Sequence, residues 1–576
     1  MSKLHRFFLF FSVVFGTNSY GQDEALYLNN KSYTYEQLIQ TYEGLAQQSE
    51  FVQLIAIGKS DVGKAIHVVV VSKDGISTPD QARKGGKSIL LINNGIHAGE
   101  VCGIEASAAL VKKLSDSEHE LYKMLDSVVV LIIPVYNVGG MLNRGSYSRA
   151  NQNGPEEHGF RGNAKNLDLN RDFIKLDSRN AKTFTQVFRA WDPDIFVDTH
   201  TTNGSDHQYT LTLINTQKDK LNPVLSEFVE NEMLLSFYQS MRERRMDMIP
   251  YVYNYKSSPD EGIKSFLETP RYSSGYASLF DCFSFVTEAH VYKPFKQRVQ
   301  HTLGFLETVV SYSAENSTTI QRKRKQAKQL TKTQNQFTIQ WELDTTKFEK
   351  ISFNGYSTEV RKSELTGQEM MFYNRDKPFA KTVEYYNSFK PKVKVVKPKY
   401  YVVPQAYDQV VDRLKLNKVK LTQLGQDSII EAHVYYIEDF KSPKTPYEAH
   451  FLHSDVEVLK KKEQVQLYEG DYLIHVNQEE NRYIVETLEP QSVDGFFAWN
   501  FFEGILQQKE WFSEYAFEPK ALQFLRENPD VKKEYEKKKE EDEGFAKDSW
   551  AQLYYIYKES PHYETTVNRF PVYRVE

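Results

Sequence analysis

The chain has 576 residues, of which 40% are hydrophobic and 26% are charged, and its formal net charge is −5. This composition is ordinary for a soluble globular protein, and it excludes disorder or a fibrous architecture for most of the chain. The near-neutral charge gives no electrostatic case for binding nucleic acid. Because Cys102 and Cys282 are the only two cysteines, a disulfide framework and a Cys-based zinc module are also excluded. One disulfide between them and two separate buried thiols are equally open.

The first 21 residues have the features of a secretory signal peptide. Lys3 and Arg6 precede an apolar run over residues 7–15, and small residues follow the run up to Gly21. A membrane span needs about twenty apolar residues, so this run is too short, and no other segment is long enough. We therefore expect cleavage near Gly21 and a secreted or periplasmic protein without a membrane span.

Short β-branched runs alternate with amphipathic segments between residues 65 and 288. Six runs have the pattern of buried strands: 66–71, 88–93, 128–135, 194–199, 209–214 and 283–287. Three segments carry apolar residues at helical spacing: 103–114, 178–191 and 225–244. The alternation predicts an α/β domain over residues 22–317, with helices covering the faces of a β-sheet.

The composition changes after this domain. Residues 318–336 are rich in Lys, Arg, Gln and Thr, which predicts a polar linker or the solvated face of a helix. Residues 337–488 alternate apolar and polar side chains, as antiparallel strands do. This alternation is clearest in three stretches: 393–403, 428–437 and 472–476. Helical character returns over residues 497–515. We expect residues 337–576 to form a β-rich accessory domain with a helical end.

The accessory domain carries many aromatic residues but no catalytic motif. Because aromatic side chains chiefly fill cores, we expect this domain to pack on the first one and to shape its entrance. A platform for peptides or glycans is the alternative.

A histidine and a glutamate stand three residues apart soon after the buried run 88–93. His97 and Glu100 would project to one side of a turn, where both can bind a single zinc ion. Such a pair is also expected by chance, so it is weak evidence by itself.

His200 follows another buried run directly. In open α/β sheets ligands bind at the carboxyl ends of the strands, and His97 and Glu100 also follow a strand end. The three side chains would make a His₂Glu zinc site with an open position for water. A hydrogen-bonded core histidine is the alternative for His200.

Two further polar sites follow the same logic. Glu288 ends the last buried run, where it could take a proton from zinc-activated water or be a salt-bridge partner. Residues 166–172 form a polar cluster, or a plain loop, between the ligand segments. There Arg171 offers a planar fork for a carboxylate, and Asp168 could hydrogen-bond a zinc histidine and fix its tautomer.

These four segments, in this order, resemble the zinc metallocarboxypeptidase family typified by carboxypeptidase A, over roughly residues 33–312. The resemblance implies a mixed central β-sheet flanked by helices. It implies that His97, Glu100 and His200 bind one zinc ion and that Glu288 is the general base. It also implies that Asn170 and Arg171 hold the terminal carboxylate of the substrate and that Asp168 orients His97.

The family also uses an arginine that stabilises the oxyanion and a tyrosine that closes over the substrate. By similarity Arg149 fits the first role best, with Arg144 and Arg161 as rivals. Tyr272 is favoured over Tyr276 for the second role.

The sequence therefore predicts a secreted zinc metallocarboxypeptidase that hydrolyses the C-terminal bonds of peptides or proteins with a free C-terminus. Two alternatives are open: a zinc amidase or deacylase acting on cell-wall peptides or acyl amino acids, and a non-catalytic binding protein on the same fold. Phe280 and Phe283 hint at a preference for apolar terminal residues.

Overall fold

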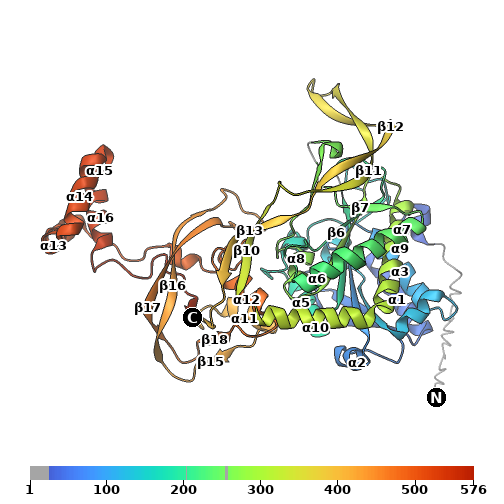
Figure 1. Ribbon diagram of the computed structural model, residues 1–576, viewed down its shortest axis with the longest axis horizontal. Coiled ribbons are helices and arrows are strands. Elements are labelled where there is room, and N and C mark those ends of the chain that lie inside the picture. Colours follow the sequence, from blue (N-terminus) through green and yellow to red (C-terminus); the bar gives the residue numbers. More distant parts are fainter. Residues whose placement is uncertain (1–24, 203, 253, 255–256) are drawn as a thin grey trace, which may run out of the picture.

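The computed structural model describes residues 25–202, 204–252, 254 and 257–576, so the predicted signal peptide lies outside the described residues. Figure 1 shows an α/β body, a β-rich body beside it and a group of helices, α13 to α16, at the far end. Within the described ranges, no helix has both the length and the apolar character needed to cross a membrane.

An eight-stranded mixed sheet forms the centre of the first domain, in the order β1-β2-β4-β3-β5-β9-β6-β7. Its strands are β1 (Val52–Lys59), β2 (Ala65–Val71), β3 (Ser88–Asn94), β4 (Val128–Ile133), β5 (Ile195–Thr202), β6 (Leu211–Asn215), β7 (Met248–Pro250) and β9 (Phe283–His290). Strand β5 is parallel to β3 on one side and to β9 on the other, so the carboxyl ends of these three strands meet at one edge. The predicted α/β fold with a mixed sheet is confirmed.

Helices cover both faces of this sheet. They are α1 (Tyr35–Gln48), α2 (Pro79–Lys84), α3 (Cys102–Leu114), α4 (Val138–Leu142), α5 (Arg179–Trp191), α6 (Pro223–Phe228), α7 (Leu234–Glu243), α8 (Ser273–Ser278) and α9 (Phe295–Glu315). Phe196 of β5 packs on Phe184 of α5, with ring centroids 5.7 Å apart. Phe285 lies one register position further along β9 and packs on Phe237 of α7, at 5.1 Å. Because side chains alternate between the faces of a strand, these two contacts lie on opposite faces.

Most of the segment predicted as a polar linker is the helix α10 (Ser317–Thr333). Its Arg324 is buried, and the guanidinium donates to Asp194 at 2.8 Å and to Asp192 at 2.9 Å. Both aspartates lie in the connection between α5 and β5, so their ion pairs attach the helix to the end of the central sheet. Of the two alternatives that the sequence left open, the segment is a helix, and one of its faces packs on the first domain through Arg324, whose acidic partners composition does not reveal. The domain boundaries at 317 and 337 stay a prediction.

The rest of the chain is built mainly of antiparallel strands. Two pairs come first: β10 (Gln336–Leu343) with β13 (Phe389–Val396), and β11 (Glu349–Lys362) with β12 (Glu369–Tyr386). The end of β12 also pairs with the short strand β8 (Ile263–Lys264) of the first domain. A six-stranded sheet follows, made of β14 (Tyr400–Val403), β15 (Thr422–Gln423), β16 (Ser428–Lys441), β17 (Ser454–Leu467), β18 (Tyr472–His475) and β19 (Tyr573–Val575). The predicted β-rich character of this region is confirmed.

Helices α11 (Asp408–Leu416) and α12 (Asn481–Leu488) lie within the β-rich region, and four helices form the end of the chain. The four are α13 (Glu514–Glu527), α14 (Pro529–Glu541), α15 (Glu543–Lys547) and α16 (Ser549–Glu559). The helix predicted over 497–515 is wrong, because this stretch holds only a short 3-10 turn at Glu503–Leu506 before α13 begins. Phe497, Trp499 and Phe502 are buried, so their spacing reflects a loop that fills a core and not a helix.

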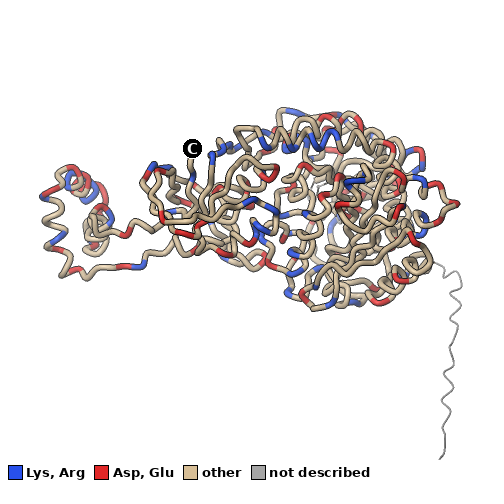
Figure 2. The backbone as a smooth tube through the Cα atoms, turned by 90° about the horizontal axis from the view of Figure 1, so that it is seen from below, with Lys and Arg blue, Asp and Glu red and all other residues tan. Residues whose placement is uncertain are grey.

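Basic and acidic residues both occur throughout the described chain. Figure 2 shows Lys and Arg interspersed with Asp and Glu along both bodies and along the terminal helices.

Cys102 and Cys282 are both buried free thiols, which decides between the two alternatives that the sequence left open.

Replacing Arg324 with Ala should lower the free energy of unfolding by about 1–3 kcal/mol, because Oδ1 of the buried Asp194 would lose its donor while Oδ2 keeps its ion pair with Arg83. Arg322→Ala, on the exposed side of the same helix, should change it by less than about 0.5 kcal/mol. Denaturant unfolding of both variants is the measurement. Equal effects of the two substitutions would contradict the pinning of α10.

Candidate functional site

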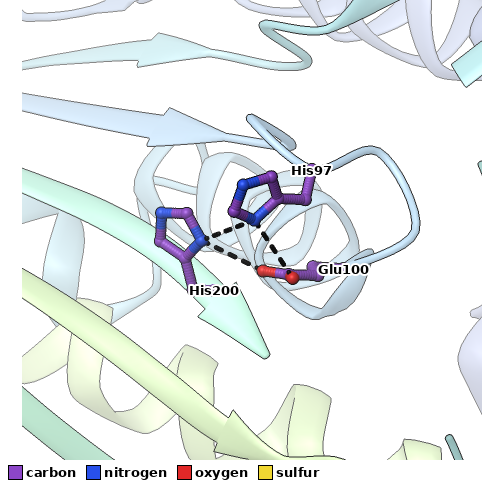
Figure 3. A group of neighbouring side chains, drawn as sticks. All are labelled: His97, Glu100 and His200. Carbon is purple, nitrogen blue, oxygen red and sulfur yellow. Dashed lines mark hydrogen bonds and ion pairs between the residues drawn. The ribbon is translucent and has the colours of Figure 1, made fainter. Parts of the chain in front are cut away.

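Three side chains converge at the edge where β3, β5 and β9 end. Figure 3 shows His97, Glu100 and His200 pointing toward one another. His97 Nδ1 lies 3.1 Å from Glu100 Oε1, and His200 Nδ1 lies 3.0 Å from Glu100 Oε2 and 3.2 Å from His97 Nδ1. All three residues are buried, and one ligand atom of each lies within 4.8 Å of the other two.

Two glycines allow this approach. Gly95 follows β3 with φ +66°, a left-handed conformation that turns the chain toward His97 and that other residues rarely adopt. A Cβ atom on Gly103 would lie 1.9 Å from the hydroxyl of Thr199, so only glycine lets α3 lie this close to β5. The sequence thereby brings the loop before α3 against the strand that carries His200.

Carboxylates fix the outer nitrogen of each imidazole. His97 Nε2 lies 2.9 Å from Asp168 Oδ1, and His200 Nε2 lies 2.8 Å from Asp198 Oδ2. A protonated Nε2 that donates to a carboxylate leaves a lone pair on Nδ1. Two lone pairs and the Glu100 carboxylate then face one point, an arrangement that needs a cation.

The spacing of these atoms fits zinc. Ligands bound tetrahedrally to zinc at about 2.0–2.1 Å are about 3.3 Å from one another, and the observed separations are 3.0–3.2 Å. The donor set of two imidazoles and one carboxylate is one that zinc prefers in catalytic sites. The outer carboxylates are the partners that zinc-binding histidines usually have.

The Glu100 carboxylate is kept ionised. Burial alone would raise its pKa, but the neighbouring imidazoles and the guanidinium of Arg149 lower the pKa well below its ordinary value. Arg149 Nη1 donates to Oε1 at 3.0 Å, and the backbone N–H of Thr201 donates to Oε2 at 2.9 Å. Glu100 is therefore available as an anionic ligand at neutral pH.

The triad opens into a pocket of about 540 Å³. Glu288 of β9 lines the same pocket, and its Cα is the register partner of His200 on β5. Burial raises the pKa of Glu288 to about 8, and the negative charge of Glu100 adds to the shift. A cation at the triad would oppose this shift by stabilising the carboxylate. The lining also includes Arg149, Arg161, Asn170, Arg171, Tyr272 and Ser273.

The three candidate arginines differ in position. Arg149 lines the pocket and donates to the backbone oxygen of Thr201 at 3.1 Å. Arg161 also lines the pocket but is engaged by Asp168, at 2.8 Å. Arg144 points elsewhere, and its Nη2 donates to the backbone oxygen of Ser32 at 2.9 Å. Arg149 and Arg161 therefore both stay candidates for contact with substrate, whereas Arg144 does not.

Asn170, Arg171 and Tyr272 form one wall of the pocket. The guanidinium carbon of Arg171 lies 4.4 Å from the centre of the Tyr272 ring, a cation–π contact. Asn170 Oδ1 accepts a hydrogen bond from the backbone N–H of Ser273 at 3.0 Å, which ties this wall to α8.

The other aromatic candidates lie in the core. Tyr276 is buried, and its hydroxyl donates to Asn417 at 2.6 Å. Phe280 stacks on Tyr483, with ring centroids 5.5 Å apart, and Phe283 is also buried. Neither phenylalanine is part of the pocket lining, so the hint at apolar specificity from these residues is wrong.

Sequence reasoning missed residues that support the site. Asp198 precedes His200 by two residues on β5, so both side chains lie on one face, and the Asp-x-His pattern at a strand end could have revealed it. Ser273 donates to the same Asp198 carboxylate at 2.6 Å. Tyr447 and Glu448 of the β-rich region also reach Arg171 and Asp168, and no local motif announces these contacts.

Comparisons with known proteins agree on one family. The model of the family described as zinc carboxypeptidase matches residues 38–371, more than half of the chain. "Carboxypeptidase 2" of Trichophyton tonsurans and that of Trichophyton rubrum are each 20% identical to the chain, covering 76% of it and 78% of the relative.

Solved structures with similarity to the chain include a metallo-carboxypeptidase from Pseudomonas aeruginosa in complex with (2-guanidinoethylmercapto)succinic acid. It is 17% identical with a TM-score of 0.37, and the match covers 49% of this chain and 69% of that one. Carboxypeptidase A from Helicoverpa armigera is 14% identical with a TM-score of 0.37, over 50% of this chain and 74% of that one.

Asp198→Asn should weaken zinc binding about 10–100-fold, because the outer nitrogen of His200 loses its anionic partner. Competition with a chromogenic chelator measures the change in zinc affinity. Asp376→Asn, an exposed substitution in the β11–β12 hairpin, is the control and should bind zinc as the unmodified protein does. Unchanged affinity in Asp198→Asn would contradict the fit of the triad to a metal.

Proposed function

Because the chain belongs to the zinc carboxypeptidase family and is a metallocarboxypeptidase, we propose that it removes C-terminal residues from peptides, with Glu288 as the general base. The observation that carries this proposal is that one pocket contains the His97–Glu100–His200 triad, a carboxylate and a guanidinium. These are the groups that hydrolysis of a terminal peptide bond requires.

The triad would hold one zinc ion per chain. When bound, zinc polarises a carbonyl group and lowers the pKa of water toward neutrality. His97 and His200 would bind through Nδ1, because Asp168 and Asp198 engage their outer nitrogens. Glu100 would contribute the negative charge.

Glu288 would hold and move the proton. Its carboxylate lines the pocket beside the triad, where it can accept a proton from the attacking water and then deliver it to the leaving amine. Burial raises the pKa of Glu288, and a cation at the triad would lower it again by stabilising the carboxylate. Between these opposing influences the carboxyl group can accept a proton and then donate it, as this cycle requires.

Arg149 would stabilise the negative charge that develops on the scissile carbonyl oxygen. Its guanidinium is fixed by Glu100, Thr201 and Gln152, so it needs no reorganisation during the reaction. A fixed donor of this kind commonly contributes about 3–4 kcal/mol to transition-state stabilisation.

Arg171 and Asn170 would bind the terminal carboxylate of the substrate. A planar guanidinium recognises a carboxylate through two parallel hydrogen bonds. Tyr272 lies under the Arg171 guanidinium, and its ring would cover the bound C-terminal residue. Binding of a free terminal carboxylate beside the triad would make the enzyme an exopeptidase.

The catalytic unit that we propose spans residues 22–317, with residues 337–576 as an accessory domain on its flank. Export of the protein stays a prediction from the sequence of the first 21 residues.

Glu288→Gln should lower kcat by about 10²–10⁴-fold, because the amide cannot take the proton from water. Zinc content should not change, since Glu288 is not a proposed ligand. Turnover of a blocked dipeptide and metal analysis of the same sample are the measurements. Glu315→Gln, at the exposed end of α9, is the matched control. Near-normal turnover in Glu288→Gln would overturn the assignment of the base.

Arg171→Gln should lower kcat/KM for peptides with a free C-terminus by about a hundredfold, because the carboxylate loses its charged partner. The variant should also lose most of the discrimination against the same peptides with an amidated C-terminus. Arg322→Gln on α10 should retain the discrimination. An unmodified enzyme that cleaves free and amidated peptides equally well would contradict the role of Arg171.

A further inference from the structure

A tight turn of the β-rich region lies against the pocket wall that Asn170, Arg171 and Tyr272 form. The turn comprises Tyr447, Glu448, Ala449 and His450, in the connection between β16 and β17. The backbone N–H of Tyr447 donates to the oxygen of His450 at 2.7 Å, and that of His450 donates back at 3.0 Å. Glu448 and Ala449 have φ of 50° and 66°, the left-handed region that favours glycine. Strained backbone of this kind persists only where the surroundings hold it in place.

The contacts of the 447–450 turn lead to one short segment of the first domain. Glu448 Oε2 accepts a hydrogen bond from the backbone N–H of Asp168 at 2.8 Å. His450 Nε2 lies 2.7 Å from the carboxylate of Asp177. The turn is therefore bound at both ends of the segment that carries Arg171.

The hydroxyl of Tyr447 engages Arg171 directly. Arg171 Nε donates to this hydroxyl at 2.9 Å, and Arg171 Nη1 donates to the backbone oxygen of Asn170 at 2.8 Å. Within the part of the chain that the structure describes, Nη2 of Arg171 makes no hydrogen bond. The Tyr447 ring also lies against Trp499 of its own domain, with centroids 6.2 Å apart and planes inclined by 20°. The ring that carries the hydroxyl thus packs on a buried indole.

These contacts determine which edge of the guanidinium a ligand can use. Tyr447 takes the Nε edge, and the stack on Tyr272 covers one face. A carboxylate in the pocket can then reach only the Nη edge. Without the Tyr447 hydroxyl, the guanidinium could rotate about its long side chain, and rotamer freedom would be lost again on each binding event.

We infer that Tyr447 is a positioning residue for the terminal carboxylate of the substrate, so that the β-rich region completes the substrate site of the first domain. This inference rests on the proposed carboxypeptidase function. It assigns to a turn of the accessory domain a part in substrate binding through Arg171.

Tyr447→Phe tests the inference in the full-length zinc-loaded enzyme. For a blocked dipeptide with a free C-terminus, KM should rise about tenfold while kcat stays within about twofold, because the unrestrained Arg171 guanidinium must lose its rotamer freedom on each binding event. In the Arg171→Gln background the same substitution should have no further effect on kcat/KM, since its action depends on the guanidinium. Tyr436→Phe removes another hydroxyl of the same region, one that donates to Glu463, and should leave KM unchanged.

Each outcome decides one question. An unchanged KM in Tyr447→Phe, or the same loss of kcat/KM with and without Arg171, would overturn the inference and leave a merely structural contact. Release of no terminal residue by the unmodified enzyme would instead refute the proposed function. Zinc content and the thermal midpoint of Tyr447→Phe should equal those of the unmodified protein, which separates positioning from misfolding.

Discussion

The site depends on the convergence of three electron-pair donors on one point in a buried environment. Two imidazole nitrogens and a carboxylate would repel one another there unless a cation is present. Asp168 and Asp198 on the outside of His97 and His200 favour this polarity, because in a neutral imidazole an Nε2 that donates to a carboxylate leaves a lone pair on Nδ1. The parallel order of β3, β5 and β9 brings the three segments to one sheet edge. The chemistry of the site therefore depends on the topology of the sheet.

The β-rich region is coupled to the site through cations that cross between the two parts. Arg189 of α5 donates to Glu480 at 2.6 Å, and Arg271, next to Tyr272, donates to Asp494 at 2.8 Å. Buried pairs of this kind cost much to break, since the remaining partner is left charged and unsolvated. Together with the 447–450 turn, these ion pairs hold in place the pocket wall that Asn170, Arg171 and Tyr272 form. The accessory domain is therefore placed where it can influence substrate binding without contributing a catalytic group.

The sequence predicted what local patterns determine. Continuous β-branched runs identified six of the eight strands of the central sheet, and polar residues at strand ends pointed to His97, Glu100, His200 and Glu288. It could not predict what depends on distant partners. The composition of residues 318–336 left a linker and a helix open, because it does not show that Arg324 is buried against carboxylates more than 100 residues away. The helix predicted over residues 497–515 was wrong because the spacing of its aromatic residues arises from a loop that packs into the core. Tyr447 lies 276 residues from Arg171, and no local signal links them.

The most direct test of the account combines metal analysis with product analysis on the purified enzyme. Zinc content is measured by mass spectrometry, and free amino acids released from a mixed peptide library are identified with and without a chelator. We expect about one zinc ion per chain and chelator-sensitive release of single C-terminal residues. Release that persists after zinc has been removed, or zinc-dependent cleavage at internal bonds only, would contradict it.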